Sequence, residues 1–185
     1  MIYIIAGIAK SGKSIIARDI LEKFHMQVIS TDWIMMMLYH GNKELNIDVN
    51  KSDSSVSKSL EPYLEGLISS LVHSKNNYLI EGVHIKPRFI DKLMIKYPNQ
   101  IKCIFLGYKE LDPGIKSNEL KIHANQIDNP WYQYLSDHEL LHLTHYLQKE
   151  SERLYHECIE FNKVYIEVRD ILIDKNQIIK ALLDK

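Results

Sequence analysis

Residues 2–14, IYIIAGIAKSGKS, decide the fold. The apolar, β-branched run at residues 2–6 ends at Gly7, which is typical of a buried strand. From residue 13 to Phe24, apolar side chains recur at helical spacing. Residues 7–14 between them match the pattern G-x-x-x-x-G-K-[ST]. This strand, loop and helix predict a site where backbone amides and a helix N-terminus bind phosphate groups.

The loop has the chemistry needed to bind a nucleoside triphosphate such as ATP. Its glycines let amide groups turn inward around phosphate oxygens. Lys13 has the position of the lysine that reaches the β- and γ-phosphates, and it is our first catalytic candidate. Ser14 has the position of the hydroxyl that ligates Mg²⁺. We therefore expect the nucleotide to contact Gly7, Ala9, Lys10, Ser11, Gly12, Lys13, Ser14 and Ile15.

The rest of the chain alternates short apolar strands with helical segments. Such alternation is typical of a parallel sheet with helices on both faces. We predict an α/β protein with a three-layer P-loop NTPase fold and a five-stranded parallel sheet. The four further strands are expected at residues 28–30, 78–81, 101–106 and 164–168.

We expect residues 1–185 to form a single domain, because the chain shows neither an internal repeat nor a Pro/Gly/Ser-rich linker. Residues 39–58 are polar and rich in Asn, Ser and Lys, which predicts a loop and a possible acceptor-binding insertion. Residues 109–135 are the candidate lid-like segment.

Two acidic residues follow predicted strands. Asp32 is placed to accept or orient the proton of an acceptor hydroxyl during phosphoryl transfer, and it is the second catalytic candidate. Alternatively, Thr31 or Asp32 only caps the short helix beginning at Trp33. Glu81 ends a strand where an acid commonly holds Mg²⁺ through a water molecule, although a surface acid explains it too.

Only four of the 23 cationic residues are arginines, so each can be considered singly. Arg88 opens a helix near Glu81 and is a candidate for binding an anionic group of the acceptor. Arg153 is a candidate for contacting the nucleotide phosphates, and Arg169 for stacking on the base. The alternative for each is a solvated surface cation.

Three histidines, His138, His142 and His145, recur at helical spacing that would suit a metal ion. A leucine stripe occupies the other side of the same predicted helix, so we expect these histidines to face water.

Composition excludes several classes of function. The 185 residues include 23 Lys plus Arg and 24 Asp plus Glu, and this net charge of −1 argues against a nucleic-acid partner. The two cysteines, Cys103 and Cys158, lack CxxC spacing and suit buried, reduced thiols. No apolar run approaches the length of a membrane span, so we expect no membrane partner and a cytoplasmic location.

Three segments, residues 7–14, 29–34 and 79–87, resemble those of 2-phosphoglycerate kinases and related adenylate-kinase-like small P-loop kinases, including zeta-toxin-type kinases. The resemblance implies a nucleoside- or shikimate-kinase-like fold with ATP and Mg²⁺ as cofactors. It places Lys13 and Ser14 at the phosphates and Asp32 beside the acceptor hydroxyl, with Glu81 and His84 lining the site.

The lid-like segment departs from these kinases, which commonly carry several arginines there. Residues 109–130 hold Lys109, Lys116, Lys121 and His123 instead. The leading hypothesis remains a kinase that transfers the γ-phosphoryl group of ATP to a small metabolite or nucleotide. The alternatives are a P-loop nucleotide-binding regulatory domain with little kinase activity, and a toxin-type sugar-nucleotide kinase.

Overall fold

The computed structural model describes residues 1–45, 47–124 and 130–184. Its strands are β1 (Ile2–Gly7), β2 (Gln27–Ser30), β3 (Tyr78–Gly82), β4 (Ile101–Gly107) and β5 (Val164–Glu167). Its α-helices are α1 (Lys13–Phe24), α2 (Thr31–Gly41), α3 (Asp53–Val72), α4 (Pro87–Lys96), α5 (Pro113–His123), α6 (Asp137–Glu160) and α7 (Ile171–Leu183). Two short 3₁₀ helices are η1 (Lys43–Leu45) and η3 (Trp131–Tyr134).

The five strands form one parallel sheet in the order β2-β3-β1-β4-β5. At its centre, Ile4 of β1 lies between Ile80 of β3 and Cys103 of β4. The strands are continuous apolar runs because both faces of a parallel sheet are covered. The predicted α/β fold with five parallel strands is therefore confirmed, and the predicted strand positions agree with the observed ones to within about two residues.

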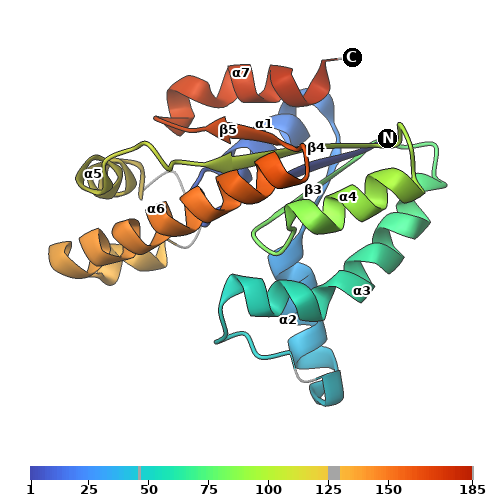
Figure 1. The fold of residues 1–185 in the computed structure, drawn as a ribbon, viewed down its shortest axis with the longest axis horizontal. Coiled ribbons are helices and arrows are strands. Elements are labelled where there is room, and N and C mark those ends of the chain that lie inside the picture. The colour runs from blue at the N-terminus through green and yellow to red at the C-terminus, as the bar shows by residue number, and fades with distance from the viewer. Residues whose placement is uncertain (46, 125–129, 185) are drawn as a thin grey trace.

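Helices cover the sheet on both faces, giving three layers (Figure 1). Helices α1 and α7 pack on one face in a cluster that includes Ile16, Ile20 and Ile178. Helices α3, α4 and α6 pack on the other face, where Leu64 and Phe89 belong to the larger cluster. Helices α2 and α5 lie at the edge where the strands end, and ligands of open parallel sheets bind at this edge.

Helix α6 buries the leucine side predicted from its sequence. Leu140, Leu147 and Leu154 are buried, whereas His138, His142 and His145 are exposed, as expected. Both cysteines are buried and free, as expected. Among the described residues, no helix is both long and apolar enough to cross a lipid bilayer.

The segment at residues 39–58 is more helical than predicted. Helix α2 continues to Gly41, and α3 begins at Asp53, with the Ser52 hydroxyl accepting a hydrogen bond from the Ser55 amide. The prediction of a loop through residue 58 is therefore wrong from Asp53 onward. The serines in the first turns of α3 interrupt the apolar pattern from which a helix is predicted. Whether this segment binds an acceptor stays a prediction.

The lid-like segment 109–135 contains α5 and η3, and residues 125–129 lie outside the described part of the chain. Leu120 of α5, Tyr132 of η3 and Leu140 of α6 form a small buried cluster of their own. This packing attaches the segment to α6. Its action as a lid stays a prediction.

Because α3 packs directly on the sheet, replacing Leu60 with Ala should lower the free energy of unfolding by about 2–5 kcal/mol. Leu60 is fully buried in α3, so the substitution leaves a cavity under the sheet. The control is Ile95→Ala on α4, where Ile95 is 76% exposed and the change should stay within about 0.5 kcal/mol. Urea denaturation measures both, and equal effects of the two substitutions would contradict the packing of α3.

Candidate active site

The loop between β1 and α1 has two positions that require glycine. Gly7 has φ 136° and Gly12 has φ 85°, both in the region that side chains disfavour. A Cβ on Gly7 would overlap the backbone of Leu106, and one on Gly12 would overlap the side chain of Ile171. Gly12 also begins α1 without any side-chain cap. The first amides of α1 therefore remain available to an anion.

Hydrogen bonds hold the loop in this shape. The Tyr108 hydroxyl donates to the carbonyl of Ala9 at 2.8 Å, and the Ser11 hydroxyl donates to the carbonyl of Ile8 at 2.8 Å. The Lys13 ammonium donates to the same Ile8 carbonyl at 2.6 Å and lies 3.4 Å from the Ser11 hydroxyl. Loop and lysine thus form one connected unit.

Lys13 is buried, with 6% of its surface exposed. Burial lowers the pKa of the Lys13 ammonium, whereas the carboxylates of Glu81 and Asp32 act in the opposite direction. A phosphate bound against the loop would add negative charge beside this ammonium and stabilise its charged form. The geometry of Lys13 suits the neutralisation of phosphate.

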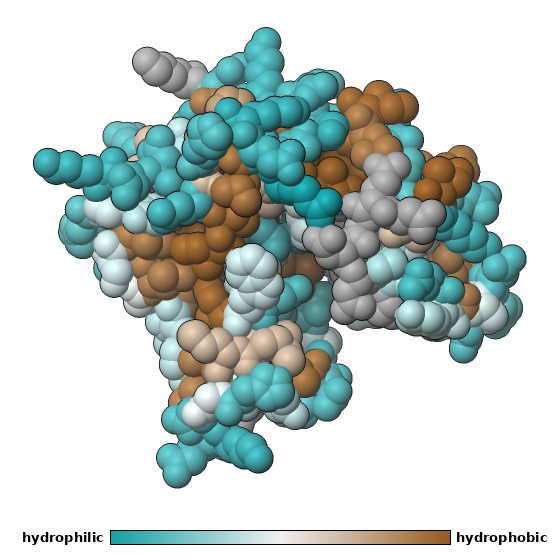
Figure 2. Space-filling model, turned by 180° about the vertical axis from the view of Figure 1, so that it is seen from behind, coloured by the Kyte–Doolittle hydropathy of each residue, from teal (hydrophilic) through white to brown (hydrophobic). Residues whose placement is uncertain are grey.

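A cavity of about 360 Å³ opens in front of the loop. Figure 2 shows the molecule from behind, hollowed between the projection at the bottom, which carries α2, and the lobe at the right, which carries α5. The predicted site residues among those that line the cavity are Ala9, Lys10, Gly12, Lys13, Ser14, Ile15, Asp32, Glu81 and His84.

Ser14 and Glu81 meet in the lining of the cavity. The Ser14 hydroxyl donates to Oε2 of Glu81 at 3.4 Å, and Glu81 is only 7% exposed. Adjacent oxygen ligands of an octahedral Mg²⁺ ion are about 3.0 Å apart, so this pair fits such an ion with little movement. Hydroxyl and carboxylate oxygens are also the donors that Mg²⁺ prefers.

Asp32 does not cap α2, so that alternative is wrong. The cap is Ser30, whose hydroxyl accepts from the Asp32 amide at 3.3 Å, because α2 begins two residues earlier than predicted. The Asp32 carboxylate instead lies 3.5 Å from Nδ1 of the buried His84 and remains 62% exposed. It is free to meet a ligand in the cavity.

His84 is held in place from several elements. Its Nδ1 lies 3.0 Å from the hydroxyl of Thr31, and its carbonyl accepts a hydrogen bond from the Ser57 hydroxyl of α3 at 2.5 Å. Burial lowers the pKa of His84, with Asp32 and Asp53 acting in the opposite direction. The imidazole is therefore mainly neutral near pH 7 and contacts Asp32 without adding a full charge.

The three arginines proposed for the site do not line the cavity. Arg153 is exposed on α6 and pairs with Glu150 of the same helix. Arg88 is exposed on α4, and Arg169 is exposed in the turn between β5 and α7. Gly7 and Ser11 also lie behind the lining and act through the shape of the loop.

The cavity includes residues that the sequence analysis did not single out for it, and they come from distant segments. Lys51 and Asp53 precede or open α3, and Glu119 and His123 lie one turn apart on α5. The spacing of Glu119 and His123 on one helix was a detectable signal. Residues 51 and 53 belong to the segment 39–58 that the sequence marks as a possible acceptor-binding insertion, but no local signal singled out these two positions.

The comparisons with known proteins place the fold. No family model matches the chain, and no curated protein matches it. The structure is similar to shikimate kinase from Bacteroides thetaiotaomicron, with a TM-score of 0.59 and 14% identity over 100% of this chain and 99% of that one. It is also similar to a gluconokinase from Sinorhizobium meliloti 1021, with a TM-score of 0.56 and 17% identity over 97% of this chain and 89% of that one.

A third similar structure is shikimate kinase from Acinetobacter baumannii in complex with shikimate, with a TM-score of 0.52 and 14% identity over 98% of this chain and 92% of that one. The chain thus has the fold of the small P-loop kinases. The resemblance inferred from three short segments is confirmed at the level of the fold. Sequence identities of 14–17% show the fold but not the reaction, which must be argued from the chemistry of the site.

The low pKa of Lys10 predicts that nucleotide binding depends on pH. Burial, followed by the neighbouring Lys13, lowers the pKa of Lys10 to about 8, and its ammonium lies 4.7 Å above the ring of Tyr132. Above that pH the free protein loses this charge, so the affinity for ATP should fall by about 3- to 10-fold between pH 7 and pH 9. ATP phosphates are already ionised in this range.

Lys10→Arg is the matched control, because arginine keeps its charge throughout and should give a flatter profile. Isothermal titration calorimetry of ATP at several pH values makes the comparison. Superimposable profiles for the wild type and Lys10→Arg would show that Lys10 does not titrate there.

Proposed function

We propose that this protein is an ATP- and Mg²⁺-dependent phosphotransferase that moves the γ-phosphoryl group to a hydroxyl group of a small molecule. One observation carries the proposal. A single cavity joins the loop cation Lys13 and the Ser14–Glu81 pair to a second, exposed acid, Asp32, held by His84. A phosphate-binding loop alone would not require that second acid.

The nucleotide end of the cavity supports binding of a triphosphate. The open N-terminus of α1 and the Lys13 ammonium supply positive charge where the β- and γ-phosphates would lie. Ser14 and Glu81 would hold Mg²⁺, Ser14 directly and Glu81 directly or through water. Bound there, the ion would neutralise charge that develops on the phosphate oxygens.

The acceptor end supports a role for Asp32 in handling a proton. Its carboxylate is accessible, and the contact with Nδ1 of His84 restricts its orientation. Asp32 would accept the proton of the acceptor hydroxyl, or orient that hydroxyl, as the phosphoryl group moves in line. His84 would act as a positioning residue, fixed by Thr31 and Ser57.

The charges at this end favour an acceptor without a strongly anionic group. Apart from the two lysines of the loop between β1 and α1, the charged residues that line the cavity are the acids Asp32, Asp53, Glu81 and Glu119 and the cation Lys51. None of the arginines lines the described cavity, and Arg88, the candidate for binding an anionic acceptor, is exposed on α4. A neutral or cationic hydroxyl compound suits these charges better than a sugar acid. A sugar nucleotide, as in toxin-type kinases, is disfavoured for the same reason.

A nucleotide-binding regulatory domain is the second candidate function. The arginine-poor cavity favours it, because lysine neutralises phosphate as a point charge but does not grip it bidentately. This candidate retains the P-loop geometry and gives Asp32 no role in turnover. Acceptor-stimulated release of ADP would exclude it.

Asp32→Asn should lower acceptor-dependent ADP release by about 100-fold or more, because the amide accepts no proton. Affinity for ATP should not fall, because Asp32 is not part of the loop and its carboxylate only adds negative charge near Lys10 and Lys13. The control is Asp48→Asn, a change of an exposed carboxylate on the neighbouring segment that does not line the cavity. A coupled assay of ADP and calorimetry of ATP measure both. Unchanged turnover in Asp32→Asn would remove the proposed role of Asp32.

A panel of acceptors tests the charge argument. Neutral polyols and amino alcohols should be phosphorylated with a kcat/KM about 10-fold or more above that of matched sugar acids and sugar phosphates, a difference equal to about 1.4 kcal/mol. The assay records ADP release with ATP and Mg²⁺ held constant. Preference for a carboxylated or phosphorylated acceptor would overturn the proposed acceptor class, and no turnover with any acceptor would favour the regulatory domain.

A further inference from the structure

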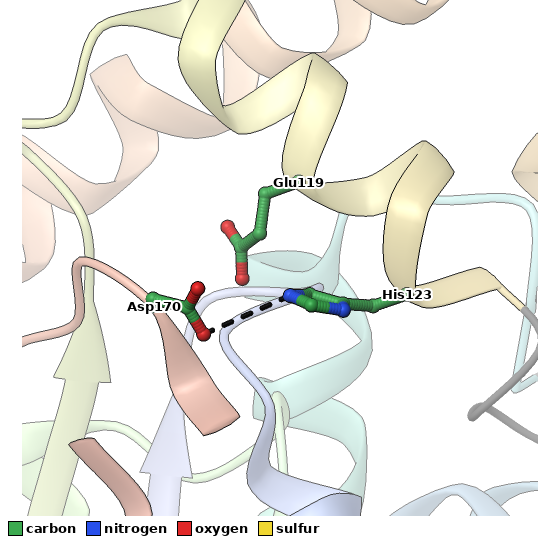
Figure 3. A group of neighbouring side chains, drawn as sticks. All are labelled: Glu119, His123 and Asp170. Atoms are coloured by element: carbon green, nitrogen blue, oxygen red, sulfur yellow. Dashed lines mark ion pairs between the residues drawn. The ribbon is translucent and has the colours of Figure 1, made fainter. Parts of the chain in front are cut away.

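Three side chains of metal-ligating types meet on the α5 side of the cavity, in a group that does not include Ser14 or Glu81. Glu119 and His123 project from one face of α5, and Asp170 approaches from the turn before α7 (Figure 3). One donor atom from each of the three residues lies within 4.8 Å of the other two. Segments about 50 residues apart in the sequence are therefore brought together around one point.

His123 lacks the hydrogen bonds that a buried imidazole normally makes. The residue is only 9% exposed, and its Nδ1 has no partner among the described residues. Its Nε2 points to Oδ1 of Asp170 at 3.7 Å, which is too long for a hydrogen bond (Figure 3). Nε2 therefore faces Asp170 without a hydrogen bond, a state in which buried polar groups are rarely left, and the space between Nε2 and Oδ1 suits a ligand.

Both carboxylates keep acceptor capacity for that ligand, because Oδ1 of Asp170, the oxygen that faces His123, has a second lone pair. Oδ1 of Asp170 accepts the hydrogen bond of the Leu172 amide as the cap of α7, at 2.9 Å. Oε2 of Glu119 accepts from the Lys116 ammonium at 2.6 Å. Among the described residues, the second oxygen of each carboxylate has no such donor. The group therefore offers one imidazole nitrogen and two carboxylate oxygens.

We propose that Glu119, His123 and Asp170 bind a divalent transition-metal ion, for which Zn²⁺ is the best match. Imidazole and carboxylate together are ligands of Zn²⁺, whereas Mg²⁺ prefers oxygen ligands alone. Ligand atoms about 2.1 Å from a tetrahedral Zn²⁺ ion are about 3.4 Å apart, so donor atoms that now lie within 4.8 Å of one another would approach by at most about 1.4 Å through side-chain rotation.

The surroundings of the site define how the ion would be held. Glu119 and His123 line the cavity, so a fourth position would be open to water or to an oxygen of a bound ligand. The Lys116 ammonium neutralises part of the charge of Glu119 and therefore weakens the ion's binding. The ion would link α5 to the turn before α7. This inference does not rest on the proposed kinase activity.

The test uses the full-length protein, stripped of metal with a chelator and kept free of nucleotide. Titration with Zn²⁺ by calorimetry should show one ion per chain. Co²⁺ should give the visible absorption of a nitrogen- and oxygen-coordinated ion. His123→Gln, Glu119→Gln and Asp170→Asn, which preserve side-chain size, should each weaken Zn²⁺ binding by about 10-fold or more.

The chain offers a matched control in the exposed histidines of α6. A variant with His138, His142 and His145 all changed to Gln removes the alternative histidine site and should keep full Zn²⁺ affinity. Circular dichroism of each metal-free variant checks that the fold is intact, with Glu119→Gln and Asp170→Asn tested separately in case one is unstable. Loss of binding in the α6 variant, or unchanged binding in all three cluster variants, would overturn the proposal.

Discussion

The structure depends on the close packing of the loop between β1 and α1 against its neighbours. Gly7 lies against the backbone of Leu106, and Gly12 lies against Ile171, so β4 and α7 both limit the path of the loop. The hydrogen bond from Tyr108 to the carbonyl of Ala9 adds a third restraint. Because β1 is paired on both sides, these contacts fix the N-terminus of α1 at the edge of the sheet where the cavity opens.

The same packing sets the electrostatics of the loop. Lys13 is buried with its ammonium on the Ile8 carbonyl, and Lys10 lies over the ring of Tyr132. Burial lowers the pKa of both lysines, because the charged ammonium groups lose contact with water. A bound anion would offset this loss of solvation. Although the cavity is poor in arginine, the two loop lysines can neutralise phosphate because each acts as a point charge.

The sequence predicts most of the fold because its signals are local. Buried parallel strands appear as continuous apolar runs, and the stripe on α6 shows which side of that helix is buried. The start of α3 escaped prediction because serines occupy its first turn, and the start of α2 because Ser30 belongs to a strand and caps a helix at once. These positions have two local interpretations, and tertiary packing selects between them.

Site residues at strand ends could be predicted from the sequence, whereas the orientation of residues on helices could not. Asp32, Glu81 and His84 follow or end strands, and the topology of a parallel sheet brings such positions together. Arg88 and Arg153 lie on helices, and the direction of a helical side chain depends on how the helix is rotated against the sheet. Their exposure could not be deduced without the packing of α4 and α6.

The lid-like segment is physically coupled to the loop, and this coupling bears on how the site works. The Lys116 ammonium of α5 lies 4.6 Å from the centre of the Tyr108 ring, and the hydroxyl of that tyrosine holds Ala9. The Lys10 ammonium of the loop lies over the ring of Tyr132 in η3. Any displacement of α5 and η3 would therefore change the surroundings of both Ala9 and Lys10. An anion bound to the loop would attract the Lys10 ammonium and so alter the contact between Lys10 and the Tyr132 ring of η3. The contacts between this segment and the loop thus run through two tyrosines rather than through arginines.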